Sequence, residues 1–186
     1  MSLLRFFEWL ATTRGSVAIH ESHYVYQIVS TVHVVTLSLF VGTAVMLDLR
    51  LLGAAMQRVP VSEVAGRLRP WTTAGFLLMV VSGALLFYAN PAPRYQNIFF
   101  RTKMVMLVLA GVNAWVFHKT VYRGVADWDL DPVPPRRARM AGGLALVLWA
   151  AMIMSGRMIA YDYFDCGRQP QPAIVNVLAG CVTEFR

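Results

Sequence analysis

The chain has 186 residues, of which 57% are apolar and only 15% charged, whereas ordinary soluble domains carry about 25% charged residues. Its mean hydropathy is +0.52. A water-soluble fold of this size buries only about two-thirds of its surface, so it could not hide this much apolar surface. The composition excludes a soluble globular enzyme, a disordered chain and a disulfide-rich secreted scaffold, and it indicates an integral membrane protein.

The net charge of +7 does not indicate a nucleic-acid-binding protein. Its Lys and Arg residues lie in clusters between apolar runs, with no Lys/Arg-rich stripe and no recognition motif. Basic residues beside membrane spans account for the excess of positive charge. We therefore expect the lipid bilayer, and no nucleic acid, around this chain.

The N-terminal stretch of residues 1–14 is not a secretory signal, because its apolar part is short and is interrupted by Glu8 and Arg14. Its apolar residues alternate with Arg5 and Glu8, a pattern typical of a short amphipathic helix at the membrane interface. We predict an interfacial segment over residues 1–20. A frayed terminus is the simpler alternative.

Four stretches contain no Asp, Glu, Lys or Arg, namely residues 22–47, 70–93, 104–118 and 140–156. A helix needs about 20 residues to cross the ~30 Å hydrocarbon core. The third stretch reaches this length by extending back to Ile98, and the fourth by extending forward to about Tyr161. All nine prolines lie outside the interiors of these runs, where helices end. The sequence predicts an all-α membrane protein, with a four-helix transmembrane bundle over residues 21–162 and an irregular tail over 163–186.

The termini lie on one side of the predicted bundle, side A, and loops 48–70 and 119–139 lie on the other, side B. Side B holds nine of the 17 Lys and Arg residues, so the positive-inside rule slightly favours a cytoplasmic side B. Cys166 and Cys181, 15 positions apart, can form a disulfide in a periplasmic tail. Two free cysteines in a cytoplasmic tail are the alternative. We expect a bacterial inner-membrane protein with both termini in the periplasm.

His33 is the first candidate for chemistry, because an ionisable group deep in a membrane helix is costly and is usually functional. Tyr26, Ser30, His33, Leu37 and Phe40 recur at helical spacing. His33 therefore continues a partly polar face that looks into the bundle. The alternative is a histidine that only bonds a neighbouring helix and stabilises the bundle.

The other three histidines lie near the ends of spans. His118 closes the third span beside Lys119, where an interfacial position competes with a role as a ligand. His20 and His23 flank Glu21 before the first span. Two histidines at i and i+3 can bind a metal, but polar residues just before a span commonly face the hydrated membrane interface.

Further polar residues lie on the third and fourth spans. One face of the third span carries Lys103, Met106, Ala110, Asn113 and Phe117. Asn113 needs a hydrogen-bond partner in mid-membrane and is therefore predicted to face protein. Arg157, in the run SGRMIAY, either extends to the interface or holds an anionic group such as a carboxylate or propionate.

Histidines on the first and third spans of a four-helix bundle suggest a haem. A single haem between His33 and His118 does not fit the helix geometry. With a rise of ~1.5 Å per residue, His33 lies ~13 Å below Tyr24 and His118 lies ~30 Å below Ile98. Two axial nitrogens must lie about 4 Å apart across one metal.

Three arrangements remain open. His33 can pair with a methionine, because Met106 and Met152 lie near its depth. Two copies of His33 can meet across a homodimer axis. His33 and His118 can also bind separate cofactors in opposite leaflets.

Several landmarks follow one another along residues 22–161: His33 in STVHVV, Gly42, DLRLLG at 48–53, Gly83, Lys103 in RTKMVMLVLA, and His118. This order resembles small bacterial membrane proteins with the layout of the HemJ-type protoporphyrinogen oxidases and, more loosely, of the CopD copper-resistance family. The combination of DLRLLG with SGRMIAY is similar, more closely still, to an uncharacterised bacterial family of integral membrane proteins. HemJ-type proteins are associated with haem b, so the resemblance implies haem b, with His33 and Lys103 as functional positions.

The leading hypothesis is a haem b-binding membrane protein that passes electrons between a quinone or membrane partner and a periplasmic partner. His33 is expected to be an axial ligand and His118 a second ligand or a second-site ligand. Lys103 and Arg157 are expected to contact a propionate or a quinone. The cofactor supplies the redox chemistry, and its ligands and apolar surroundings tune it.

Two other classes of function compete with this hypothesis. A copper-handling protein is one, because thioethers are soft ligands for Cu(I). The methionines expected to face the bundle are Met79, Met106, Met152 and Met154. A cofactor-free anchor or assembly subunit is the other, with a soluble partner on loop 119–139 or on the cysteine tail.

Overall fold

The computed structural model describes residues 3–161, 166–167 and 169–181. Its helices in chain order are α1 (Leu3–Ala11), α2 (Arg14–Glu21), α3 (Val25–Leu52), α4 (Val61–Ala89), α5 (Pro91–Tyr95), α6 (Ile98–Thr120), the 3₁₀ helix η1 (Tyr122–Asp127), α7 (Arg136–Met158) and α8 (Ala173–Ala179). These ranges contain no strand. Helices α3, α4, α6 and α7 are long and apolar enough to cross a membrane. The predicted all-α, four-span, multi-pass membrane protein is thereby confirmed.

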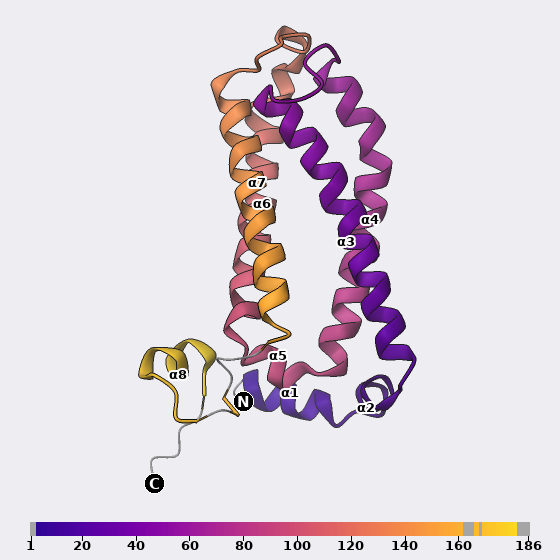
Figure 1. The fold of residues 1–186 in the computed structure, drawn as a ribbon, viewed down its shortest axis with the longest axis vertical. Coiled ribbons are helices and arrows are strands. Elements are labelled where there is room, and N and C mark those ends of the chain that lie inside the picture. The colour runs from indigo at the N-terminus through magenta and orange to yellow at the C-terminus, as the bar shows by residue number, and fades with distance from the viewer. Residues whose placement is uncertain (1–2, 162–165, 168, 182–186) are drawn as a thin grey trace.

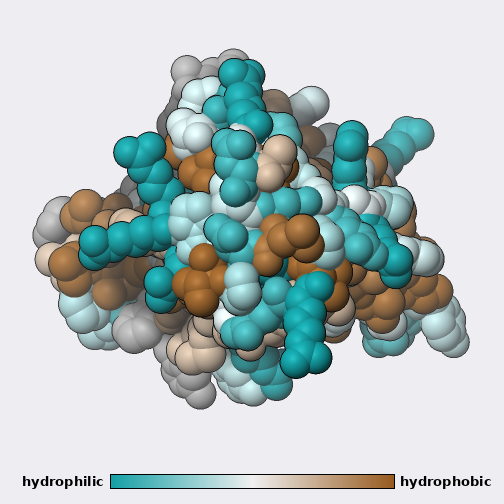
Figure 2. Space-filling view, turned by 90° about the horizontal axis from the view of Figure 1, so that it is seen from above, coloured by the Kyte–Doolittle hydropathy of each residue, from teal (hydrophilic) through white to brown (hydrophobic). Residues whose placement is uncertain are grey.

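The four long helices run along the long axis of the molecule (Figure 1). Helix α3 packs against both α4 and α7, and α6 packs against α7. The two pairs converge at the side-B end, at the top of Figure 1, and separate toward side A, where α1, α2 and α5 lie across the open end. Seen from side B, hydrophilic side chains spread over the end of the bundle and project past its edge (Figure 2).

The side-B loop before α4 is shorter than the predicted loop 48–70. Helix α3 continues to Leu52 and α4 begins at Val61, so Pro70 lies inside α4 and not at its end. The charge-free run that begins at Pro70 marks only the part of α4 without charged residues. The first two turns carry charges, and Glu63 forms an ion pair with Arg67 at 2.7 Å. Proline is tolerated inside membrane helices because neighbouring groups satisfy the freed backbone.

Small residues bring the long helices close together. A Cβ atom on Gly75 of α4 would lie 3.0 Å from the backbone nitrogen of Phe40 on α3. A Cβ atom on Gly142 of α7 would lie 2.8 Å from the carbonyl oxygen of Asp48. Because glycine has no side chain, α4 and α7 can both approach the backbone of α3 at these two positions.

The N-terminal segment forms two short helices, whereas the pattern predicts one. Thr13 separates them, and its hydroxyl donates to the Leu10 carbonyl at 2.7 Å. Helix α2 is attached to the end of α4, because Ser16 donates to the Tyr88 carbonyl at 2.8 Å. On α1, Phe7 packs edge-on against Phe87 of α4, with ring centroids 5.3 Å apart.

The C-terminal tail contains helix α8, which corrects the prediction of an irregular tail over 163–186 for the part that is described. Cys166 and Cys181 form a disulfide that brackets α8. Arg101 of α6 donates to the Leu178 carbonyl at 2.6 Å and so attaches α8 to the bundle.

Candidate functional site

His33 lies on the face of α3 that packs against α4. Its Nδ1 atom is 3.1 Å from the Met79 carbonyl oxygen and 3.1 Å from the Ser82 hydroxyl. A carbonyl oxygen only accepts hydrogen bonds, so Nδ1 carries the proton and donates. In a neutral ring Nε2 then carries the free lone pair, and no group in the described part of the chain bonds to it. His33 therefore presents an oriented acceptor inside the membrane span.

Gly83 of α4 lies beside the imidazole. A Cβ atom at this position would come within 3.1 Å of His33 Cε1. Because real Cβ contacts are rarely this short, any larger residue would push the ring away from Met79 and Ser82. Gly83 thus keeps His33 in its hydrogen-bonded position.

Two further cations belong to the side-A end of the bundle: Arg94 lies on α5, and Lys103 lies in the second turn of α6. Arg94 donates to the Tyr26 hydroxyl at 3.0 Å. Lys103 has no hydrogen bond or ion pair with any described residue, and its Nζ lies 3.7 Å from where a Cβ on Gly156 would sit.

These cations have no carboxylate partner within residues 3–161, 166–167 and 169–181, where the one ion pair is that of Glu63 with Arg67. A hollow of about 210 Å³ opens beside Arg94; its lining residues are Asn90, Pro93, Arg94, Asn97, Ile159 and Ala160.

Arg94 is a residue that sequence reasoning did not single out, whereas Arg157 is one that it did. Arg157 is exposed on α7 and donates to the Tyr161 hydroxyl at 2.9 Å, one turn away. Its guanidinium also lies 5.1 Å from the centroid of the Tyr161 ring, so its described contacts are local to this end of the chain. The signal for Arg94 was its place beside two prolines, in a connection that has to fold back under the bundle.

His118 is exposed at the side-B end of α6, where its ring stacks on Tyr122 with centroids 5.4 Å apart. The structure therefore does not bring His118 and His33 together. His20 and His23 are exposed as well. The described residues contain no group of three or more His, Cys, Asp or Glu side chains that could hold a metal ion.

The methionines lie in different surroundings. Met106 packs against the buried cluster of Ala110, Leu148 and Met152 between α6 and α7. Met154 is 68% exposed and faces outward, so the expectation that it faces the bundle is wrong. Asn113 does face protein as predicted, because its amide donates to the Ala141 carbonyl of α7 at 2.9 Å.

The DLRLLG run contributes two buried polar residues at the side-B end. Asp48 is 8% exposed and accepts a hydrogen bond from Trp149 Nε1 at 3.0 Å. Arg50 is fully buried and donates to the carbonyl oxygens of Val59, Asp129 and Asp131. This run therefore joins α3 to α7 and to both side-B loops, which is a structural role that its sequence pattern did not reveal.

Asp129 completes this end of the molecule. Its carboxylate accepts from the Ser62 backbone N–H at 2.7 Å and from the Ser62 hydroxyl at 2.5 Å, and so it caps the start of α4. Burial alone raises the pKa of Asp129, but the bonds from Ser62 and Val61 and the charge of Arg50 outweigh it and hold this pKa below its usual range. The group is ionised at neutral pH.

The fold and these polar groups define a multi-pass membrane protein with a four-helix bundle, a histidine site in its side-A half and a polar hub at its side-B end. Residues 6–162 match the family described as "Family of unknown function (DUF6644)", and the chain belongs to this family. The matched part includes all four spans and both the DLRLLG and SGRMIAY runs. No curated protein and no solved structure matches the chain.

Proposed function

We propose that this protein binds haem b through His33 and carries electrons between the membrane quinone pool and a partner on side A. The observation that carries the proposal is the orientation of the imidazole. Metal-bound histidines almost always donate their second ring N–H to a carbonyl or carboxylate, which sets the tautomer and the ring plane. The Met79 carbonyl holds His33 in this way and leaves Nε2 for a metal.

The charges around His33 support the same assignment. Haem b carries two propionates, and Lys103 and Arg94, which have no carboxylate partner among the described residues, can pair with them. Arg94 thereby joins Lys103 and Arg157 in the set of expected contacts. Met106 is one turn from Lys103 on α6 and would offer its thioether sulfur as a further ligand to the haem.

Each of these residues has a defined task in the proposed site. When bound, haem supplies one-electron transfer at a potential set by its ligands and its surroundings. Met79 and Ser82 orient the imidazole, Gly83 leaves it room, and Lys103 stabilises negative charge. The apolar residues of α6 and α7 around Met106 exclude water.

We further propose that side A is the periplasmic face of a bacterial inner membrane. The disulfide of Cys166 with Cys181 on this side is of a kind that persists in oxidising compartments. The slight excess of Lys and Arg on side B fits a cytoplasmic side B. Electrons would then leave the protein toward a periplasmic partner.

Visible spectra of the purified protein, oxidised and then reduced with dithionite, test this proposal together with a pyridine haemochrome count. Wild type from haem-supplied cells should show a Soret band and a sharp reduced α-band. His33→Ala should lose both bands and remain folded by circular dichroism. His118→Ala is the matched control, because this exposed histidine should be replaceable without loss of haem.

A full haem complement in the His33→Ala variant would refute the assignment of His33. A colourless wild type would refute haem binding as a whole. Stoichiometric copper in that colourless protein would favour the copper hypothesis, and co-purification of a soluble protein would favour the anchor.

A further inference from the structure

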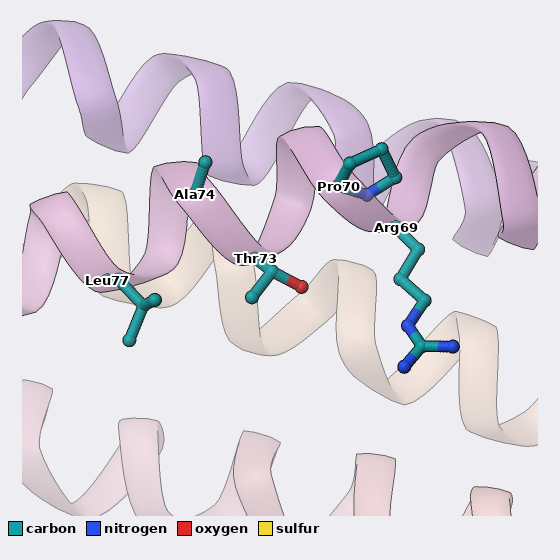
Figure 3. Close-up of a pocket in the computed structure, with 5 residues that line it drawn as sticks. All are labelled: Arg69, Pro70, Thr73, Ala74 and Leu77. Atoms are coloured by element: carbon teal, nitrogen blue, oxygen red, sulfur yellow. The ribbon is translucent and has the colours of Figure 1, made fainter.

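A shallow hollow of about 550 Å³ lies on the outer surface of α4 near side B; its lining residues are Arg69, Pro70, Thr73, Ala74 and Leu77. All five belong to α4. Arg69, Thr73 and Leu77 are spaced by four residues and project to the same side of the helix (Figure 3). The hollow therefore runs along the helix axis, from a charged end to an apolar end.

The charged end is free to bind a ligand. Arg69 is exposed and has no hydrogen bond or ion pair with a described residue, whereas Arg67, two residues earlier, is paired with Glu63. Thr73 also has no hydrogen bond from its hydroxyl within the described part of the chain. An arginine fork and a hydroxyl one turn apart are suited to the oxygens of a phosphate.

The apolar end is suited to an acyl chain. Leu77 is 57% exposed, and Ala74, which projects to the other side of the helix in Figure 3, has a short side chain that leaves the hollow open. From Arg69 to Leu77 the helix rises by about 12 Å, which is a large part of one leaflet of a ~30 Å hydrocarbon core. The stretch of α4 from Arg69 to Leu77 is therefore long enough to contact an acyl chain over much of the length of that chain.

The position of the hollow matches the level of lipid headgroups. Arg69 is the last charged residue before the apolar run of α4. Trp71 is 61% exposed beside it, and exposed tryptophans concentrate at the membrane–water interface. The apolar end continues into the lipid-facing surface of α4, where Leu78 and Val81 are also exposed.

We propose that this hollow binds an anionic phospholipid of the side-B leaflet, with its phosphate on Arg69 and Thr73 and an acyl chain along Ala74 and Leu77. The preference for a net negative headgroup follows from Arg69, the one cation among the described residues that line the hollow, because the ammonium of a zwitterionic lipid would repel its guanidinium. This site is independent of the histidine site, which lies in the other half of the bundle.

Native mass spectrometry of the full chain released from detergent micelles tests the proposal with three probes: phosphatidylglycerol, phosphatidylcholine with the same acyl chains, and inorganic phosphate. We expect one tightly held phosphatidylglycerol, weaker phosphatidylcholine, and no competition from millimolar phosphate. Arg69→Gln should weaken phosphatidylglycerol binding about tenfold, as loss of a charge-assisted hydrogen bond implies. Arg67→Gln is the matched control and should bind like wild type.

Ala74→Leu gives a second, charge-neutral test, because it fills the hollow and leaves Arg69 in place. It should weaken binding of phosphatidylglycerol, and the exposed position should leave the unfolding temperature unchanged. Equal binding by the Arg69→Gln and Arg67→Gln variants would overturn the proposal. Equal retention of the two lipids would overturn the charge preference, and displacement by inorganic phosphate would show a free-anion site in place of a lipid site.

Discussion

Arg50 and Ser62 are connected through Asp129, which binds one with its backbone carbonyl and the other with its side-chain carboxylate. Arg50 Nη2 donates to the Asp129 backbone carbonyl at 3.3 Å, while the Asp129 carboxylate holds the backbone and hydroxyl of Ser62. The buried guanidinium of Arg50 on α3 thereby positions Asp129, and Asp129 in turn caps the start of α4. Because the contacts reach three segments far apart in the sequence, we expect this end of the bundle to unfold as one unit.

Replacement of Arg50 by Met should strongly destabilise the protein. The change removes the donor of the Val59 and Asp131 carbonyl oxygens, whereas the Asp129 carbonyl keeps its bond from the Val61 N–H. A buried polar group left unsatisfied typically costs about 1–3 kcal/mol. Arg50→Lys should be intermediate, since an ammonium cannot reproduce the fork of the guanidinium. Thermal unfolding in detergent measures the effect, with exposed Arg58→Met as the control. Equal unfolding temperatures for the Arg50→Met and Arg58→Met variants would contradict the prediction.

The stability of the side-B end should depend on pH through Asp129. The pKa of this carboxyl is lower in the folded protein than in the unfolded chain, where it is about 3.9. Its contribution is therefore complete above the unfolded pKa and is lost as the pH falls through the folded pKa. Asp129→Asn should unfold at a lower temperature than wild type at pH 7, and the two should converge on acidification. A gap that stays constant down to pH 3 would contradict this.

Gly75→Ala should destabilise the contact between α3 and α4. The added methyl would meet the backbone of Phe40, which cannot rotate away, and overpacking of this kind typically costs about 1–3 kcal/mol. Gly111→Ala is the matched control, because nothing lies within 4 Å of a Cβ at that helical position. Unfolding temperatures of the two variants in the same detergent decide the question, and a drop of equal size in both would refute it.

Trp149→Phe should destabilise the bundle by leaving the Asp48 carboxylate without its donor. An unsatisfied buried polar group costs about 1–3 kcal/mol. Asp48→Asn separates this effect from general disturbance of the site, because the amide oxygen can still accept from Trp149 Nε1. We therefore expect a milder effect from Asp48→Asn. A larger loss of stability in Asp48→Asn than in Trp149→Phe would show that charge, and not the hydrogen bond, is what matters there.

Lys103→Gln should lower the midpoint potential of a haem bound at His33. A cation beside the site stabilises the form with the extra electron, so its removal favours the oxidised form. Lys119→Gln is the control, because Lys119 is exposed at the opposite end of α6. Redox titration of the α-band measures both, and equal potentials in the two variants would place Lys103 outside the haem environment.

The spans could be predicted closely because hydropathy is a local property summed along the chain. His33 could also be singled out, since an ionisable residue in the middle of an apolar run is visible without any knowledge of its neighbours. The beginning of α4 could not be predicted from hydropathy. The loss of charge at Pro70 marks the hydrocarbon region, whereas the helix starts at Val61, where Asp129 from a distant loop supplies the cap.

The sequence by itself determined a multi-pass four-helix membrane protein, because its apolar composition indicates a membrane and its four charge-free runs mark one span each. Only the tertiary structure decided which polar groups meet. It joined Arg94 of α5 to Tyr26 of α3, and it made Asp48 and Arg50 the hub of the side-B end. The physical reason is that hydropathy depends on each residue alone, whereas hydrogen bonds and charge pairs depend on distances that only helix packing sets.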